Sequence, residues 1–397
     1  MALSRLTQLA ANAAFGLKRG LGILERQSPA ASWSSVALAA NEESEFLHKW
    51  KSKSPSLPIA LLDRIFLAPH LEQYAVALGH SPEAEAKAIS SGRFRTLDNE
   101  FTSLGVPPEW NRGQQTQSSA HWTKVILNSD AEAVAASSAS QFNWAYTVVR
   151  AWLLTGSDTY AELFWNYFED WIEKNPPNRG PQWVGDEAIA QRLIAVTFAA
   201  QVLRFHSATT DARILKVARF VSASATRLHL THHYICTRSA LIGFTSALAL
   251  FSAGALWSQL PEADVWRSHS LEHLINEGKE LISDDGRLNG INLNSAGQVL
   301  EILTLTELIL RCENERESLP ESLHRKIRAL VMLSVSQASA DRATPNLFSL
   351  SGCYRGDIRP AIAAAQILFT GTHFDAGPWD EEALLLVGPL CDSAVIV

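Results

Sequence analysis

The clearest hydrophobic pattern of this 397-residue chain lies between residues 141 and 174. Large apolar side chains recur there every four positions, at Trp144, Val148 and Trp152 and again at Leu163, Tyr167 and Trp171. This spacing places side chains on one face of an α-helix. Between the two series, residues 155–158 include a glycine, which commonly ends a helix. The pattern predicts two amphipathic helices joined by a short turn.

Similar helical patterns continue through most of the chain. Helices are predicted over residues 42–50, 59–77, 83–90, 187–205, 211–231, 241–260, 264–282, 299–311, 321–340 and 359–369. Short loops rich in Gly, Pro, Asn and Ser separate many of them, strand patterns are scarce, and residues 93–117 predict an irregular connection. Helix pairs repeated over this length favour an all-α fold, a toroid or solenoid of helical hairpins, over a compact bundle.

The first 58 residues are interpreted as an N-terminal extension with a helix and a Ser/Ala/Pro-rich linker, and residues 59–397 as the helical domain. Four basic residues surround the apolar run 9–17, mostly after it, which is the reverse of the order in a secretory signal. An ordinary packing helix is favoured, and an amphipathic helix on a membrane surface and a cleaved signal remain open. No apolar stretch is long enough to span a membrane. We expect a cytoplasmic or peripheral membrane protein rather than a periplasmic one.

Composition indicates a globular protein and excludes some partners. Hydrophobic residues make up 47% of the chain, and 41 acidic against 34 basic residues give a formal net charge of -7. Because no long block of basic residues occurs, we expect no nucleic-acid partner. The four cysteines, Cys236, Cys312, Cys353 and Cys391, lack CxxC spacing, so neither a disulfide framework nor a zinc motif is predicted. No cofactor is expected.

A series of short motifs in a fixed order carries a family resemblance. They are Gly92-Arg93-Phe94, Trp110, residues 152–160, residues 171–177, Gly180-Pro181-Gln182-Trp183, Arg192, Leu241-Ile242-Gly243, residues 260–266 and Asp285-Gly286. Over about residues 90–390 the chain resembles the helical N-terminal domain of heparinase II/III-like polysaccharide lyases. The resemblance implies an incomplete (α/α) toroid with a sugar-binding cleft. Because the family's C-terminal β-sandwich would begin about where this sequence stops, we expect no such domain here.

The resemblance also implies which positions should hold the catalytic groups of a lyase. Elimination from a uronic-acid polymer needs a group that neutralises the carboxylate, a base for the C5 proton and an acid for the leaving oxygen. The family has Asn-Asn-His before the helix that begins Leu-Ile-Gly, and Tyr-His after the Asp-Gly turn. The corresponding residues here are Arg238-Ser239-Ala240 and Ser295-Ala296. A serine hydroxyl without an activating partner is too weak a base, so the expected base and acid are missing.

The remaining polar and aromatic residues supply the candidate site. For substrate binding we select Trp183, Glu187, Arg192 and Arg238. Arg192 is expected near the cleft, either paired with Glu187 or facing a ligand. Trp183 is as consistent with the core as with stacking on a sugar. Arg238 is as consistent with a salt bridge at the start of a helix as with binding a carboxylate or phosphate.

The weaker catalytic candidates are His232, His233 and Tyr234, which stand next to His229 in the only histidine cluster. No metal site is predicted, because the cluster lacks a neighbouring third ligand in the sequence. A packing or surface role is favoured for these histidines over a metal-binding or catalytic one.

Three functions follow from these observations. The preferred one is a heparinase II/III-like protein that binds a bacterial-type polysaccharide or oligosaccharide, in its metabolism or assembly, without cleaving it. The second is a divergent lyase that acts by β-elimination on an acidic glycan, with a protein partner supplying the missing β domain. The third is a protein-interaction scaffold whose cleft is filled.

Overall fold

The computed structural model describes residues 2–38, 43–53, 57, 72, 82–95, 100–291, 295–314, 317–337, 358–372 and 377–387. Helices dominate the part described. The α-helices are α1 (Ala2–Gly20), α2 (Ile23–Gln27), α3 (Glu43–Ser52), α5 (Pro82–Ser90), α6 (Ala131–Ala139), α7 (Trp144–Thr155), α8 (Asp158–Lys174), α9 (Asp186–Val202), α10 (Asp211–Arg238), α11 (Ala240–Leu256), α12 (Ala263–Leu281), α13 (Ala296–Glu313), α14 (Glu321–Gln337), α15 (Arg359–Thr370) and α16 (Glu381–Val387).

Short 3₁₀ helices and one small sheet complete these elements. The 3₁₀ helices are η1 (Trp33–Ser35), η3 (Gln115–Gln117), η4 (Trp122–Lys124), η5 (Pro181–Trp183) and η7 (Pro378–Asp380). Strands β1 (Arg93–Arg95) and β2 (Phe101–Ser103) pair antiparallel, with Phe94 opposite Thr102. This hairpin lies where an irregular connection was predicted. It was missed because three residues are too few for an alternating pattern to be recognised.

The predicted helical hairpin is confirmed as α7 and α8. Gly156 ends α7 with φ of 68°, a left-handed conformation that glycine adopts without steric cost. The later helices agree with the predictions to within a few residues, except that α10 continues to Arg238 instead of ending near residue 231. Apart from Glu72, the helix predicted over residues 59–77 lies outside the described residues, as does the domain boundary predicted at residue 58.

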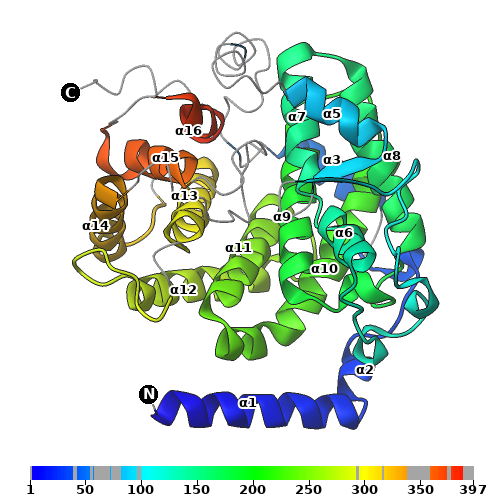
Figure 1. Cartoon of the computed structure of the whole chain (residues 1–397), viewed down its shortest axis with the longest axis horizontal. Coiled ribbons are helices and arrows are strands. Elements are labelled where there is room, and N and C mark those ends of the chain that lie inside the picture. The colour runs from blue at the N-terminus through cyan, green and yellow to red at the C-terminus, as the bar shows by residue number, and fades with distance from the viewer. Residues whose placement is uncertain are drawn as a thin grey trace.

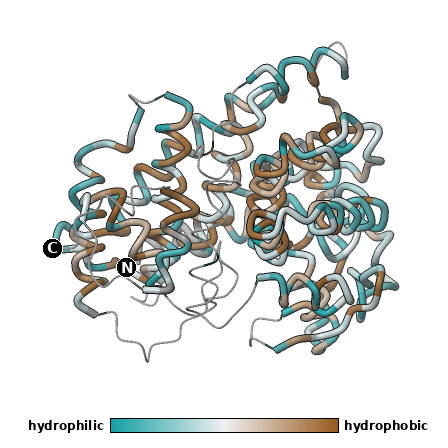
Figure 2. Tube along the Cα trace, turned by 90° about the horizontal axis from the view of Figure 1, so that it is seen from above, coloured by the Kyte–Doolittle hydropathy of each residue, from teal (hydrophilic) through white to brown (hydrophobic). Residues whose placement is uncertain are grey.

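The helices form an incomplete α/α toroid. In Figure 1, α5 to α8 lie on one side, α13 to α16 on the other, and α9 to α12 connect them. Hydrophobic residues concentrate on the helix sides that face other helices, as Figure 2 shows. Every residue of α11 from Gly243 to Leu256 is buried. A helix that is apolar on all sides must be enclosed by others, and α11 contacts α9, α10, α12 and α13.

The hydrophobic core is rich in tryptophan. Six tryptophans are almost completely inaccessible to solvent: Trp110, Trp165, Trp171, Trp183, Trp257 and Trp266. Rings from distant segments meet there, as when Trp33 of η1 lies 6.0 Å from Trp183 and 6.4 Å from Phe220 between ring centroids. The N-terminal segment is thereby attached to α10. Among the described residues, no helix combines the length and apolarity needed to cross a membrane.

Candidate functional site

The junction of α10 and α11 holds the first position where lyase chemistry was expected. Ser239 is extended, with φ of -152°, and its Oγ accepts a hydrogen bond from the Ile242 amide at 3.3 Å. This is an N-cap, in which the side chain satisfies an otherwise free amide at the start of a helix. The Ser239 hydroxyl therefore has a structural role in starting α11.

The second such position lies at the start of α13. Ser295 precedes this helix without forming a side-chain cap, and Ala296 is buried. Gln298 Nε2 donates to Thr245 Oγ1 of α11 at 3.1 Å, so the N-terminal parts of α11 and α13 are in contact. The tertiary structure thus brings the two positions onto neighbouring helix ends, and neither presents an imidazole or phenol.

Arg238 and Tyr234 are accessible at the same junction. Arg238 is exposed at the last residue of α10, and its guanidinium carbon lies 5.5 Å from the centroid of the Tyr234 ring. Tyr234 is half-buried and stacks on Phe15 of α1, with centroids 3.8 Å apart and planes 4° apart. A cation next to an aromatic ring suits a ligand that has both a carboxylate and an apolar sugar face.

The three adjacent catalytic candidates do not converge. Consecutive residues of a helix are rotated by about 100° from one another, so their side chains point in different directions. His232 points toward α12, His233 is exposed, and Tyr234 packs against α1. These three side chains therefore do not form a shared catalytic group.

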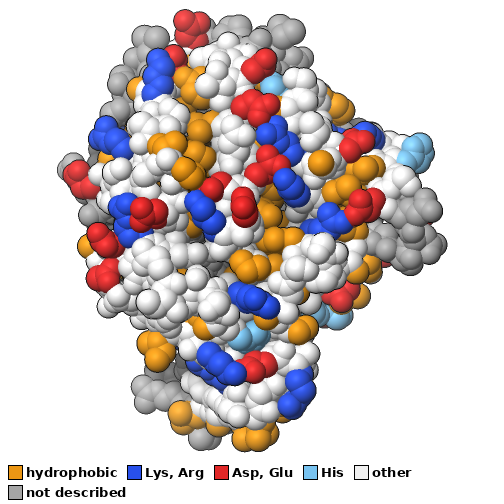
Figure 3. All heavy atoms as spheres, turned by 90° about the vertical axis from the view of Figure 1, so that its right-hand side faces the viewer, with side chains coloured by type: hydrophobic (Ala, Val, Ile, Leu, Met, Phe, Trp, Pro, Cys, Tyr) orange, Lys and Arg blue, Asp and Glu red, His pale blue; other side chains and the backbone are white. Residues whose placement is uncertain are grey.

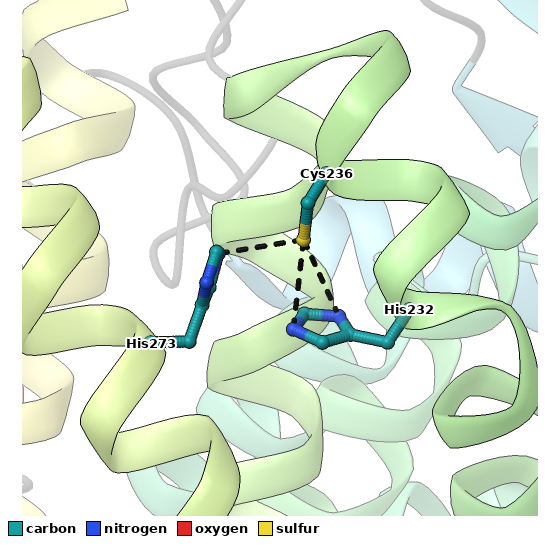
Figure 4. Close-up of side chains that lie close together, drawn as sticks. All are labelled: His232, Cys236 and His273. Atoms are coloured by element: carbon teal, nitrogen blue, oxygen red, sulfur yellow. Dashed lines mark hydrogen bonds between the residues drawn. The ribbon is translucent and has the colours of Figure 1, made fainter. Parts of the chain in front are cut away.

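His232 instead meets two residues that were not selected from the sequence. Cys236 Sγ lies 3.6 Å from His232 Nε2 and 3.5 Å from His273 Nε2, and the three side chains point toward one another in Figure 4. One ligand atom from each lies within 4.8 Å of the others. His273 is on α12, 37 residues after Cys236, so sequence spacing gave no signal of this cluster.

Burial perturbs all three members of this cluster, and it lowers the pKa of His273. It raises the pKa of the Cys236 thiol to about 12, with a smaller contribution from the Glu277 carboxylate. Burial also lowers the pKa of His232 to about 3, helped by the positive charge of His273 when that is protonated. Near neutral pH the side chains of His232 and Cys236 are both uncharged.

Arg192 and Trp183 are placed in the core. Arg192 is 0% exposed, and it donates to the Ser140 carbonyl at 2.8 Å and to the Gln182 carbonyl at 2.7 Å. Burial lowers the pKa of Arg192 to about 9, so the group stays charged near neutral pH. The expected pairing of Arg192 with Glu187 is wrong, because these two carbonyls and the Trp171 ring surround the guanidinium. Trp183 is also 0% exposed and offers no face to a sugar.

Glu187 lies apart from Arg192, in the first turn of α9. Its side chain is half-buried, and loss of solvation raises the pKa of its carboxyl. The preceding residue, Asp186, accepts hydrogen bonds from Arg227 Nη1 at 3.1 Å and from Thr231 Oγ1 at 2.9 Å. Asp186 thereby compensates the charge of Arg227, which is itself fully buried.

Comparison with known proteins shows which proteins share the sequence pattern and the fold of this chain. The sequence profile of the Heparinase II/III N-terminus matches residues 105–361. No curated protein sequence matches the chain. Among solved structures, one of heparinase III is similar with a TM-score of 0.54 and 15% identity, over 77% of this chain and 43% of that one. A heparinase III gene product with methylated lysines also gives a TM-score of 0.54 at 15% identity, over 76% and 46%. The chain thus spans less than half the length of these structures, and the likeness supports the fold.

Proposed function

This chain belongs to the Heparinase II/III N-terminus family, and from that membership we propose that it binds an acidic polysaccharide without cleaving it. The matched structures carry the name heparinase, which indicates heparin, an acidic polysaccharide. The proposed role is in the metabolism or assembly of a bacterial-type polysaccharide. The observation that carries the proposal is the use of Ser239 as a helix cap where a lyase needs a reactive side chain.

The absence of cleavage follows from the chemistry at the two helix starts. Removing a C5 proton requires a group whose pKa is near the working pH, and an unassisted serine hydroxyl is far from it. The Ser239 hydroxyl is within hydrogen-bonding distance of the Ile242 amide. The Ala240 and Ala296 side chains have no proton to exchange. General acid–base groups contribute about 10²- to 10⁴-fold each, so losing both removes most of the rate enhancement.

Recognition depends in this proposal on Arg238 and Tyr234. A guanidinium can form two parallel hydrogen bonds with a carboxylate or sulfate, which a lysine cannot reproduce. On the face drawn in Figure 3, basic side chains are interspersed with acidic ones, without a broad basic surface. Because the formal net charge of the chain is -7, a few well-placed cations suit the binding of an acidic polymer better than long-range attraction.

The N-terminal helix α1 is the element through which we propose contact with a membrane surface. Leu9 and Leu17 of α1 are 64% and 63% exposed, and Lys18 follows Leu17 directly. Exposed leucines next to basic residues are typical of helices that lie in a lipid headgroup region. Binding of the protein to anionic vesicles that is lost in the Leu9→Glu/Leu17→Glu variant would support this contact. Equal sedimentation of both proteins with the vesicles would exclude it.

Calorimetry with heparin, alginate and bacterial acidic polysaccharides tests the binding proposal. We expect Arg238→Ala to weaken binding about 10-fold, the usual effect of losing a hydrogen bond between charged groups. Arg325→Ala is the matched control, because Arg325 is also an exposed arginine on a helix but lies on α14. Equal affinities for wild type and Arg238→Ala, or no binding of any polymer by the wild type, would refute the proposal.

Ultraviolet absorbance tests the absence of cleavage with the same polymers. The unsaturated uronate formed by β-elimination absorbs where the substrate does not, and we expect no increase. A robust increase that disappears in His233→Ala or Tyr234→Phe would overturn the proposal and support a divergent lyase. An increase unaffected by these variants would also overturn it and would locate the base elsewhere.

A further inference from the structure

Three side chains of types that bind transition metals converge between α10 and α12. We propose that His232, Cys236 and His273 form a site for a divalent transition-metal ion, with zinc as the main candidate. Imidazole nitrogen and thiolate sulfur together favour zinc over magnesium or calcium, which prefer oxygen. The proposal concerns residues other than Arg238 and Ser239, so it does not depend on the proposed polysaccharide function.

The helices hold the three ligands in place. His232 and Cys236 are four residues apart on α10, which places their side chains on one face, one turn apart. His273 reaches them from the middle of α12, as Figure 4 shows. Gly243 of α11 allows the close approach, since a Cβ there would lie 2.9 Å from Cys236 Sγ and 3.0 Å from its Cα. A site on helices that pack this closely changes little when a ligand binds.

The distances are those of a zinc coordination shell. Zn–S bonds of about 2.3 Å and Zn–N bonds of about 2.0–2.1 Å at a tetrahedral angle separate sulfur from nitrogen by about 3.5–3.6 Å. Cys236 Sγ lies 3.6 Å from His232 Nε2 and 3.5 Å from His273 Nε2. The two sulfur–nitrogen edges therefore already have the length that the ion requires.

A neighbouring hydroxyl supports one of the ligands. Ser246 of α11 is fully buried, and its Oγ lies 3.4 Å from His232 Nδ1. If Nδ1 donates its proton to this oxygen, Nε2 keeps the lone pair that the ion needs. Because Cys236 Sγ lies almost as close to His232 Nδ1, at 3.9 Å, as to Nε2, the ring must turn to aim that lone pair at the ion. Histidines that bind metals usually have such a partner on the other ring nitrogen, which fixes the tautomer and the orientation of the ring.

Metal binding exchanges one proton for one ion. The Cys236 thiol loses its proton to solvent, the thiolate forms a bond to the ion, and each imidazole contributes a lone pair without losing a proton. The complex of a 2+ ion with one thiolate keeps a charge of 1+. Glu277 is one helical turn beyond His273 on α12, so a carboxylate lies on the same side of this helix as His273. Three protein ligands leave a fourth position for water.

Cobalt titration of the full chain, first stripped with a chelator and kept in a thiol-free reductant, tests the proposal. We expect saturation at one equivalent, a near-ultraviolet thiolate-to-cobalt charge-transfer band, and loss of the band when zinc is added. Cys236→Ser should abolish the band. Cys312→Ser is the matched control, because Cys312 is also a half-buried free thiol but lies on α13, and it should keep the band.

Two further variants separate a direct ligand from a supporting residue. His273→Gln should weaken zinc binding by more than ~100-fold in competition with a chromogenic chelator, since even indirect support typically contributes about 10–100-fold. Ser246→Ala should weaken it by about 10-fold and keep the band. Zinc should also raise the melting temperature of the wild type and leave that of Cys236→Ser unchanged, which controls for folding of the variant.

Several results would overturn the metal site. These are the absence of a saturable band in the wild type, a band that persists in Cys236→Ser, and a band that is lost in Cys312→Ser. Equal zinc affinity for the wild type and His273→Gln would overturn it as well. In each case the three side chains form a hydrogen-bonded cluster without an ion.

Discussion

The Arg192 guanidinium lies 4.4 Å from the centroid of the Trp171 ring, in a part of the core that solvent does not reach. Burial removes the guanidinium charge from water. The aromatic face and the carbonyls of Ser140 and Gln182 together compensate for this loss of solvation. Arg192, for which the family motif suggested contact with a ligand, is thus a structural cation of the core. It connects α8, α9 and the segments that precede α7 and α9.

Arg192→Ala is therefore expected to lower stability. Two buried carbonyls would lose their donors, at about 1–3 kcal/mol each, so we expect a loss of about 2–6 kcal/mol. Urea unfolding followed by circular dichroism measures this, with Arg325→Ala on the surface of α14 as a control that should change stability little. Unchanged stability combined with lost glycan binding would instead show that Arg192 acts in ligand recognition.

The buried ion pair of Arg150 and Glu381 is expected to stabilise the contact between α7 and α16. Both side chains are at most 3% exposed, and Arg150 Nε donates to Glu381 Oε1 at 2.9 Å. Arg150→Met should destabilise by about 3–5 kcal/mol, because it leaves a buried carboxylate without its partner. The double variant Arg150→Met/Glu381→Leu should recover much of this loss. Additive losses in the double-mutant cycle would show that the two residues act independently.

Gly254 is expected to be required for the packing of α11 on α12. A Cβ at this position would lie 2.4 Å from the Ala263 carbonyl oxygen and 2.7 Å from the Arg267 amide nitrogen. Gly254→Ala should destabilise by about 1–3 kcal/mol, as extra atoms in a packed interior typically do. At Gly16 of α1 nothing lies within 4 Å, so Gly16→Ala should be neutral or stabilise by up to about 1 kcal/mol. The melting temperature should fall in Gly254→Ala and stay the same or rise in Gly16→Ala.

Glu187 is expected to make stability depend on pH. Burial raises the pKa of its carboxyl above the ordinary 4.5, so the folded state prefers the protonated form. The resulting stabilisation is present below the unfolded-state pKa and is lost as pH rises through the folded-state pKa. Glu187→Gln should therefore raise the melting temperature slightly at about pH 7 and not at about pH 4.

Glu132→Gln is the matched control for Glu187→Gln. Glu132 also lies in the first turn of a helix, α6, but it is exposed. Any effect of removing a negative charge from a helix N-terminus should then appear in both variants. An equal gain in both at pH 7 would mean that burial of Glu187 is not the cause.

The positions of the helices and the family resemblance follow from the order of residues along the chain. Apolar residues at intervals of three to four predict where helices lie, because this period is a local property of the chain. Gly156 fixed the end of α7 for the same reason, and ordered motifs such as residues 180–183 carried the resemblance. The serines at 239 and 295 were also visible as departures from lyase chemistry without any coordinates.

The role of each polar side chain depends instead on how the helices pack against one another. The sequence offers Arg192 and Trp183 as candidates for substrate binding, but they are enclosed because η1, α8 and α9 meet around them. Cys236 and His273 had no common signal in the sequence, since 37 residues separate them and their proximity depends on how α12 packs near α10. Helical periodicity reports which face of one helix is apolar, and it contains no information on which side chains of another helix that face will meet.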